Sequence, residues 1–299
     1  MSLNVALTGG SGLIGSALSA HLVARGDTVR QLVRRPARNS AEITWAPGTE
    51  PLPLHVLDDL DAIVHLAGEP LSGARWTSTK RAEIRRSRIE GTRALAKALA
   101  QFGRPVRLVS ASATGYYGAD RGREELTERS DPGPGFLAEV CQAWEGQTAP
   151  ARDHGHPVVL ARTGIVLAPR GGAMQFLRPI TKFGLAGPLG SGEQFWPWIT
   201  LADEVAALAW LIDHPEVTGP VNLVAPTPAT QGRIAASIAG AMGRPSVVPT
   251  PATVIKLVLG EFADTLLGSQ KVLPTVLTEG GFEFRHPNIE AAADWLVSS

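Results

Sequence analysis

Three glycines, three residues apart, stand between an apolar run and an amphipathic segment early in the chain. The apolar run is residues 4–7, and helical spacing of leucine, isoleucine and alanine follows up to Gly26. This order predicts a buried strand, a tight turn and a helix, because glycine permits sharp turns and close backbone approach to a ligand. Amides at the start of that helix would face the phosphates of a dinucleotide. The turn expected to bind this cofactor comprises Gly9, Gly10, Ser11, Gly12, Leu13, Ile14 and Gly15.

Apolar runs and helical patterns then alternate as far as residue 167. The predicted strands are 29–33, 62–66, 106–110 and 158–161, and the predicted helices are 76–100 and 136–152. Parallel strands need crossovers of this length, so the pattern predicts an α/β fold, a Rossmann-type doubly wound parallel sheet over residues 1–167. Residues 168–299 carry more Gly, Pro and Trp and predict a smaller C-terminal substrate lobe, partly interleaved with the last strands. A small C-terminal domain is expected from about residue 247.

Composition makes several classes of function less suitable. The 28 Lys and Arg residues balance 28 Asp and Glu, so no overall field would attract nucleic acid or an anionic membrane. Cys141 is the only cysteine, which argues against a disulfide or a cysteine-rich zinc module. No further ligands accompany His154 and His156, so no metal is expected. The sequence shows neither a signal-peptide pattern nor an apolar run of bilayer length, and we expect a cytoplasmic protein.

The end of the second apolar run bears on which dinucleotide is bound. NAD sites place an Asp or Glu about twenty residues past the glycine turn, where it holds the ribose hydroxyls. Arg34 and Arg35 stand there instead. Because guanidinium groups bind a phosphate well, the pair favours NADP, with its extra 2′-phosphate. The alternative is that both arginines are merely solvated at the end of a strand.

Several longer segments resemble those of one protein superfamily. Residues 8–15 (TGGSGLIG), 64–68 (VHLAG) and 110–118 (SASATGYYG) are similar to motifs of the extended short-chain dehydrogenases/reductases. Their atypical "epimerase family protein" branch is suggested by residues 75–76 (RW), 136–145 (FLAEVCQAWE), 162–167 (RTGIVL), 190–198 (GSGEQFWPW), 268–274 (GSQKVLP) and 281–284 (GFEF). The resemblance covers essentially the whole chain and implies NADP binding.

The resemblance also implies cofactor contacts outside the glycine turn. The matching positions are Arg34, Arg35, Leu66, Ala67, Glu83, Arg88 and Val166. The carboxyl ends of the strands line the crevice of a doubly wound sheet, which independently favours Leu66, Gly68, Ser110 and Ser112. For Glu83 and Arg88 the residues alone would favour a solvated helix surface.

The catalytic residues of the superfamily are missing from this sequence. A Tyr-x-x-x-Lys pair normally supplies the acid or base, and Leu137 and Cys141 occupy the matching positions. Ser112 could hydrogen-bond a substrate or the nicotinamide, and Tyr117 could supply a phenol, although packing of Tyr116 and Tyr117 within their loop is the simpler interpretation. Cys141 is expected to be an inert core thiol.

Two functions remain open. The first is an NADP-dependent oxidoreductase or epimerase-like enzyme, monomeric or homodimeric, acting on an unknown small molecule. The second is a non-catalytic NADP-binding sensor or partner-binding protein that has lost its Tyr-Lys pair. Gln194, Phe195, Trp196 and Trp198 could form an aromatic substrate wall, or they could simply pack the lobe. His65, inside an apolar run, is expected to be a core histidine.

Overall fold

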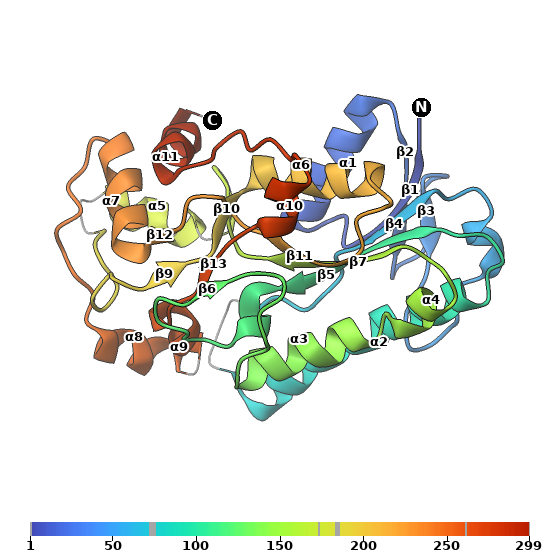
Figure 1. Ribbon diagram of the computed structural model, residues 1–299, viewed down its shortest axis with the longest axis horizontal. Coiled ribbons are helices and arrows are strands. Elements are labelled where there is room, and N and C mark those ends of the chain that lie inside the picture. The colour runs from blue at the N-terminus through green and yellow to red at the C-terminus, as the bar shows by residue number, and fades with distance from the viewer. Residues whose placement is uncertain (1, 72–75, 173, 183–185, 261, 299) are drawn as a thin grey trace.

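The centre of the molecule is a parallel β-sheet (Figure 1). The computed structural model describes residues 2–71, 76–172, 174–182, 186–260 and 262–298. Within them the sheet has seven strands in the order β11-β7-β5-β4-β1-β2-β3. Their bounds are β1 Asn4–Thr8, β2 Thr28–Val33, β3 Glu42–Thr44, β4 Ala62–His65, β5 Arg107–Ala113, β7 Val158–Thr163 and β11 Gly219–Leu223. Every neighbouring pair is parallel, which confirms the predicted Rossmann-type class.

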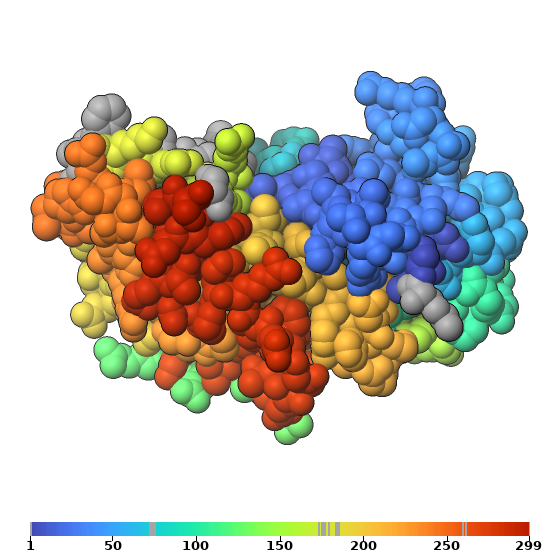
Figure 2. Space-filling view, turned by 90° about the horizontal axis from the view of Figure 1, so that it is seen from above, coloured from blue at the N-terminus to red at the C-terminus, as the bar shows by residue number. Residues whose placement is uncertain are grey.

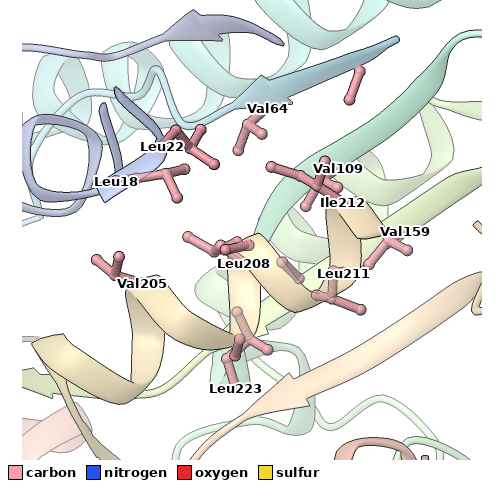
Figure 3. Close-up of a cluster of buried hydrophobic side chains, with 14 of the residues drawn as sticks. Leu18, Leu22, Val64, Val109, Val159, Val205, Leu208, Leu211, Ile212 and Leu223 are labelled. Atoms are coloured by element: carbon pink, nitrogen blue, oxygen red, sulfur yellow. The ribbon is translucent and has the colours of Figure 1, made fainter. Parts of the chain in front are cut away.

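Helices cover both faces of the sheet (Figure 1). Helices α1 (Leu13–Arg25) and α6 (Leu201–Asp213) cover one face, and α2 (Ser78–Ala100), α3 (Phe136–Gly146) and α4 (Ala149–Asp153) lie on the other. Figure 3 shows Leu18 of α1 and Leu208 of α6 meeting sheet residues such as Val64 and Val109. Full burial of each such side chain contributes about 1.5–3 kcal/mol, so this layer fixes α1 against the strands.

Most element boundaries follow from local chemistry. Gly26 ends α1 in the left-handed conformation, φ 97°, as its position in the sequence predicts. Thr77 begins α2 by accepting a hydrogen bond from the amide of Lys80. The single helix predicted over 136–152 is two helices, because Pro150, near the start of α4, lacks the amide needed to continue α3.

The C-terminal half adds a smaller lobe with its own core. This core joins Trp196 and Trp198 to apolar residues of two helices, α7 (Gln231–Ala241) and α11 (Ile289–Ser298). The other elements are β6 Glu125–Leu126, β8 Ile165–Leu167, α5 Met174–Lys182, β9 Phe195–Trp196, β10 Trp198–Thr200, β12 Ala229–Thr230, α8 Ala252–Leu259, α9 Phe262–Leu267, β13 Lys271–Val272, α10 Thr275–Glu279 and the 3-10 turns η1 Leu54–Leu57 and η2 Thr114–Tyr117. In Figure 2 the blue N-terminal residues gather at one end, and the orange and red C-terminal residues lie at the other end and in the middle.

The lobe and the sheet are joined by buried polar contacts. Strand β11 belongs to the sheet although it follows much of the lobe in sequence. Its Asn222 is fully buried, with its Nδ2 donating to the carbonyl of Leu273 at 2.9 Å and its own amide donating to Glu128 at 3.0 Å. Glu128 also accepts from the amide of Val276. Among the described residues, no helix is both long and apolar enough to cross a bilayer.

Candidate functional site

The glycine turn between β1 and α1 has no room for side chains at two of its three spaced glycines. Gly9 has φ 73°, and a Cβ there would lie 2.8 Å from the carbonyl carbon of Leu66 and 2.9 Å from the amide nitrogen of Ala67. A Cβ on Gly15 would approach the carbonyl oxygen of Gly9 to 2.3 Å. The turn is therefore packed against the end of β4 on one side and its own helix on the other, the arrangement that a dinucleotide turn requires.

The start of α1 leaves amides available for an anion. Gly12 is the N-cap, has an extended conformation, and has no side chain that could cap the helix. The first-turn amides, which include those of Leu13, Ile14 and Gly15, therefore lack intrahelical partners. Ser11 is exposed beside them. Orphaned amides with the positive end of the helix dipole fit the pyrophosphate of a dinucleotide.

A buried hydrogen-bonded group holds the end of β4 against this turn. The amide of Ala67 donates to Thr8 Oγ1 at 3.2 Å, and Nδ1 of His65 lies 2.8 Å from the same oxygen. Burial lowers the pKa of His65 to about 4, so its ring is neutral at neutral pH. His65 is thus a core histidine whose Nε2 has no partner among the described residues. The predicted residues Leu66 and Ala67 consequently border Gly9 directly.

The two arginines after β2 occupy different environments. Arg35 forms a two-pronged ion pair with Glu42 of β3, at 2.6 and 2.7 Å, and lowers the pKa of that carboxyl to about 2. Arg34 is exposed, and its charge contributes, less than the hydrogen bond from Lys80, to lowering the pKa of Glu69. Of the two guanidinium groups, that of Arg34 is thus the exposed one, whereas that of Arg35 is held by Glu42.

Arg88 of α2 lies in the crevice rather than on a solvated surface. Its guanidinium carbon is 3.5 Å from the point where a Cβ of Gly68 would stand, and Nη1 donates to the carbonyl of Glu69 at 3.0 Å. Burial lowers the pKa of this guanidinium, although the group keeps its charge at neutral pH. Glu83, one and a half turns earlier on α2, is half-buried.

Val166 lies near the glycine turn because Gly172 packs between the carbonyl of Val166 and the side chain of Leu13. A Cβ on Gly172 would lie 3.0 Å from the carbonyl of Val166 and 3.2 Å from a methyl group of Leu13. The segment after β8 therefore lies beside the N-terminus of α1. The structure thus brings the turn after β1, the residues after β4, Arg88 of α2 and Val166 of β8 to the carboxyl edge of the sheet. For Glu83 no contact with this edge is seen among the described residues.

Ser112 and Tyr117 belong to a buried network that the sequence did not reveal. Ser112 Oγ donates to Glu145 Oε1 at 2.6 Å, and Arg162 holds both oxygens of Glu145, at 2.8 and 2.9 Å. Arg162 also donates to the Tyr117 hydroxyl at 3.1 Å and lies 3.5 Å from the ring centre of Tyr116. The register of the sheet brings Ser112 close to Arg162, because Ser112 of β5 and Arg162 of β7 are direct neighbours on adjacent strands.

The phenol of Tyr117 is committed within this network. Its ring is fully buried, and its oxygen lies 2.7 Å from Asn222 Oδ1. Burial raises the pKa of the phenol above its usual value. The hydroxyl of Tyr117 in η2 therefore contacts both β7, through Arg162, and β11, through Asn222. A catalytic role for Tyr117 or Ser112 remains a prediction.

The positions of the missing pair are occupied by unreactive groups. Burial raises the pKa of the Cys141 thiol to about 12, so it is protonated at neutral pH. Its sulfur lies 3.7 Å from the carbonyl oxygen of Ala113. Leu137 presents an apolar side chain against Gly115. In the described part of the chain, no group of His, Cys, Asp and Glu residues could hold a metal ion.

A cavity of about 330 Å³, here called the lobe cavity, opens between η2, the start of α3 and helix α9. Its side chains come from both halves of the chain, and the most informative are Trp76, Arg81, Phe136, Leu137, Asp264 and Gln270. Trp76 belongs to the two-residue family motif at 75–76, and its neighbour Arg75 lies outside the described residues. Of the two interpretations of Trp196 and Trp198, a substrate wall or packing of the lobe, the structure favours packing, because both side chains are buried in the core of the lobe.

The fold, the turn and the crevice define a dinucleotide-binding protein of Rossmann type. The chain belongs to the NAD dependent epimerase/dehydratase family, whose model matches residues 5–224, and residues 250–296 match a domain of unknown function, DUF1731. An epimerase family protein of Mycobacterium bovis is 43% identical over 295 residues, covering 98% of this chain and 97% of that protein. The mouse epimerase family protein SDR39U1 is 34% identical over 99% of this chain and 100% of its own.

Solved structures agree with this assignment. The crystal structure of human epimerase family protein SDR39U1 with NADPH has a TM-score of 0.91 and 33% identity, covering 99% of this chain and 100% of that chain. A nucleoside-diphosphate sugar epimerase from Corynebacterium glutamicum has a TM-score of 0.82 and 35% identity, over 99% of this chain and 58% of its own. The predicted resemblance to the atypical epimerase branch of the extended short-chain dehydrogenases/reductases is confirmed.

Glu204, in the first turn of α6, is a buried carboxyl beside the end of β7. Its Oε1 accepts from Thr163 at 2.8 Å, and Oε2 has no partner among the described residues. Burial raises the pKa of Glu204 to about 8. The folded protein therefore binds this proton more tightly than the unfolded chain does, and stability is lost as pH rises from about 4.5 through 8.

Glu204→Gln should remove this loss. We expect the variant and the wild type to have similar free energies of unfolding near pH 4.5. The variant should become the more stable by several kcal/mol above pH 8, since each pKa unit corresponds to about 1.4 kcal/mol. Urea unfolding across this range measures the difference, and Glu279→Gln at an exposed position is the control. A wild-type-to-variant difference that does not change with pH would contradict the prediction.

Proposed function

We propose that this chain is an NADP-dependent oxidoreductase or epimerase-like enzyme that acts on a small molecule held in the lobe cavity. The observation that carries the proposal is the packed glycine turn with orphaned amides at α1, followed by Arg34 at the end of β2. Hydride chemistry would come from the nicotinamide, while the protein binds and orients both reactants. The NADPH in the human relative's structure supports the choice of phosphate-bearing cofactor.

The cofactor contacts in this proposal come from α1 with its glycine turn, the ends of β2 and β4, α2, and β8. The turn and the start of α1 would hold the pyrophosphate, and Arg34 would meet the 2′-phosphate. Arg88, half-buried beside Gly68, would offer a fixed positive charge in the crevice. Leu66, Ala67 and Val166 would border the dinucleotide with backbone and apolar surface.

A second candidate is favoured by the occupied catalytic positions. Leu137, the protonated Cys141 thiol and the network around Ser112 leave no acid–base pair of the usual kind. A protein with these features could bind NADP without turning over a substrate, as a sensor or a partner-binding protein. Tight NADPH binding with no oxidation across a panel of carbonyl compounds would establish this alternative and overturn the first.

Arg34→Gln is expected to weaken NADPH binding about 10- to 100-fold, because a charge-assisted hydrogen bond to phosphate is worth about 1.5–3 kcal/mol. NADH binding should be unchanged, since NADH lacks the 2′-phosphate. Calorimetric titration with each cofactor gives the dissociation constants, and hence the ratio of variant to wild-type affinity for NADPH and for NADH. Arg35→Gln should have the smaller effect, because Glu42 already holds that side chain.

Arg30→Gln is the matched control for this prediction. Arg30 lies within β2, before Arg34, but its partner is Asp59, and neither lies at the carboxyl end of the strand. It should leave both dissociation constants unaltered. Equal loss of NADPH and NADH affinity in Arg34→Gln would contradict the assignment of Arg34 to the 2′-phosphate.

The wider setting is part of the same proposal. The balanced charge of the chain supports a small-molecule substrate rather than nucleic acid or a membrane surface. We place the protein in the cytoplasm as a monomer or homodimer. Size-exclusion chromatography with light scattering distinguishes these two states from higher assemblies.

A further inference from the structure

The lobe cavity has an aromatic wall. The ring of Trp76 meets Phe136 edge-on with ring centres 5.8 Å apart, and it meets Phe262 of α9 at 5.6 Å. The guanidinium of Arg81 lies over the ring of Phe136, 4.3 Å from its centre. Leu137 adds apolar surface beside Phe136. Such a wall favours a flat, apolar ligand, because stacked and edge-on aromatic contacts each add to area burial.

The described side chains around the cavity offer a diphosphate a single cation, although the uncapped start of α3 also borders the cavity. Among its described lining residues, Arg81 is the one cation and Asp264 the one carboxylate, so these described side chains carry no net charge. Asp264 is exposed and lies 3.6 Å from Lys256. A nucleoside diphosphate carries at least two negative charges that normally require several cationic or amide donors. Gln270 cannot serve as such a donor, because its amide nitrogen already donates to the carbonyls of Thr114 and Gly118.

Beyond the hydroxyl of Thr265, the described lining offers no imidazole, phenol or lysine that could protonate an ordinary ketone. Its guanidinium keeps its protons at neutral pH, and the carboxylate beside Lys256 is an acceptor. Nearby, the Cys141 thiol is protonated but buried, with its pKa raised to about 12. A simple ketone becomes a strongly basic alkoxide after hydride addition and needs a general acid. A carbonyl compound whose reduced anion is stabilised by its own ring does not.

We propose that the substrate of the lobe cavity is a quinone, that is, a flat, uncharged, conjugated dicarbonyl compound. This inference rests on the proposed function, with NADPH as the reductant. The C4–H bond of the reduced nicotinamide breaks, and its hydrogen leaves with the electron pair to form an O–H bond at one quinone oxygen. The ring becomes aromatic, the other C=O becomes C–O⁻, and the ring delocalises that charge. One proton from water then completes the hydroquinone and leaves hydroxide. Phe136 and Trp76 position the quinone by contact with its ring faces and edges.

The test uses the full chain, NADPH and menadione, a small naphthoquinone. NADPH binding is measured first by calorimetry, and menadione binding is measured separately, without cofactor, by quenching of tryptophan fluorescence in wild type and Trp76→Phe. Steady-state NADPH oxidation then gives KM and kcat, with the reaction lacking protein as the blank. Phe136→Leu should raise the KM for menadione about five-fold or more with kcat within two-fold, and Phe136→Tyr should behave as wild type.

The outcomes separate this inference from the proposed function. Menadione-dependent oxidation of NADPH with the Phe136 pattern supports the quinone assignment. Binding of UDP-glucose in place of menadione, or bound NADPH that menadione fails to oxidise, overturns it while cofactor binding stands. Failure to bind NADPH overturns the proposed function itself, whatever menadione does to the tryptophan fluorescence. Arylation by the quinone is detected by mass spectrometry, and the only thiol able to form an adduct, Cys141, is buried.

Discussion

Gly9→Ala should lower NADPH affinity at least ten-fold, and also destabilise the protein. The new Cβ would stand 2.8 Å from the carbonyl carbon of Leu66, where backbone cannot give way cheaply. In addition, φ 73° is a conformation that costs a non-glycine residue about 1–3 kcal/mol. Relief of both requires the turn to move away from β4, which displaces the amides at the start of α1. Since about 1.4 kcal/mol is ten-fold in affinity, even a modest shift should be measurable by calorimetry.

Gly26→Ala separates loss of binding from loss of stability. Gly26 lies at the other end of α1, has φ 97°, and has nothing within 4 Å of an added Cβ. Alanine there carries the conformational cost alone and is far from the turn. We expect this variant to lose about 1 kcal/mol of stability and to keep its NADPH affinity. If both variants bind NADPH like wild type, the glycine turn is not the cofactor site.

Arg162→Met should destabilise the fold by about 3–5 kcal/mol, because it leaves a buried carboxylate without its cation. The side chains of Arg162 and Glu145 are only 4% and 9% exposed, so water cannot replace the lost contacts. Tyr117 also loses a donor, and Tyr116 loses the guanidinium over its ring. Chemical denaturation at neutral pH measures this loss, which is a large part of the 5–15 kcal/mol typical of a whole protein.

Arg233→Met is the matched surface change. Its pair with Glu290 has side chains 55% and 52% exposed, and loss of such a pair costs about 1 kcal/mol or less. The double change of Arg162→Met with Glu145→Leu removes both buried charges and should recover part of the stability. A cost below about 1 kcal/mol for Arg162→Met alone would show that the network does not hold β5, β7 and α3 together.

The periodic parts of the fold could be predicted from the sequence, and the short or irregular parts could not. Helix α1 with its Gly26 stop, and the strands β1, β2, β4, β5 and β7, all follow from apolar spacing and glycine placement. Strand β3 has three residues, too few to show a period. The break before α4 was visible in Pro150, but the apolar pattern around it favoured a continuous helix.

The candidate site also has a part that could be predicted from the sequence and a part that could not. The glycine turn is local in sequence, so its packing could be foreseen, whereas the network is made by residues far apart. Glu145 of α3 and Arg162 of β7 are 17 residues apart and meet because α3 packs against β5, the neighbour of β7. Arg35 and Glu42 meet through the register of β2 and β3. The Tyr-x-x-x-Lys spacing of the superfamily falls on Leu137 and Cys141, and it carries no information about the ion pair of Glu145 with Arg162.

The late return of the chain to form β11 limits how the protein can be divided. A fragment ending at residue 167 would leave the edge of β7 unpaired and would strip α6 from the apolar face that Leu208 and Leu211 cover. Exposed edges and apolar faces of this kind promote aggregation. Chimaeras that exchange substrate lobes between relatives should therefore keep Leu201–Leu223 with the nucleotide-binding portion, so that each recombined protein inherits a closed sheet.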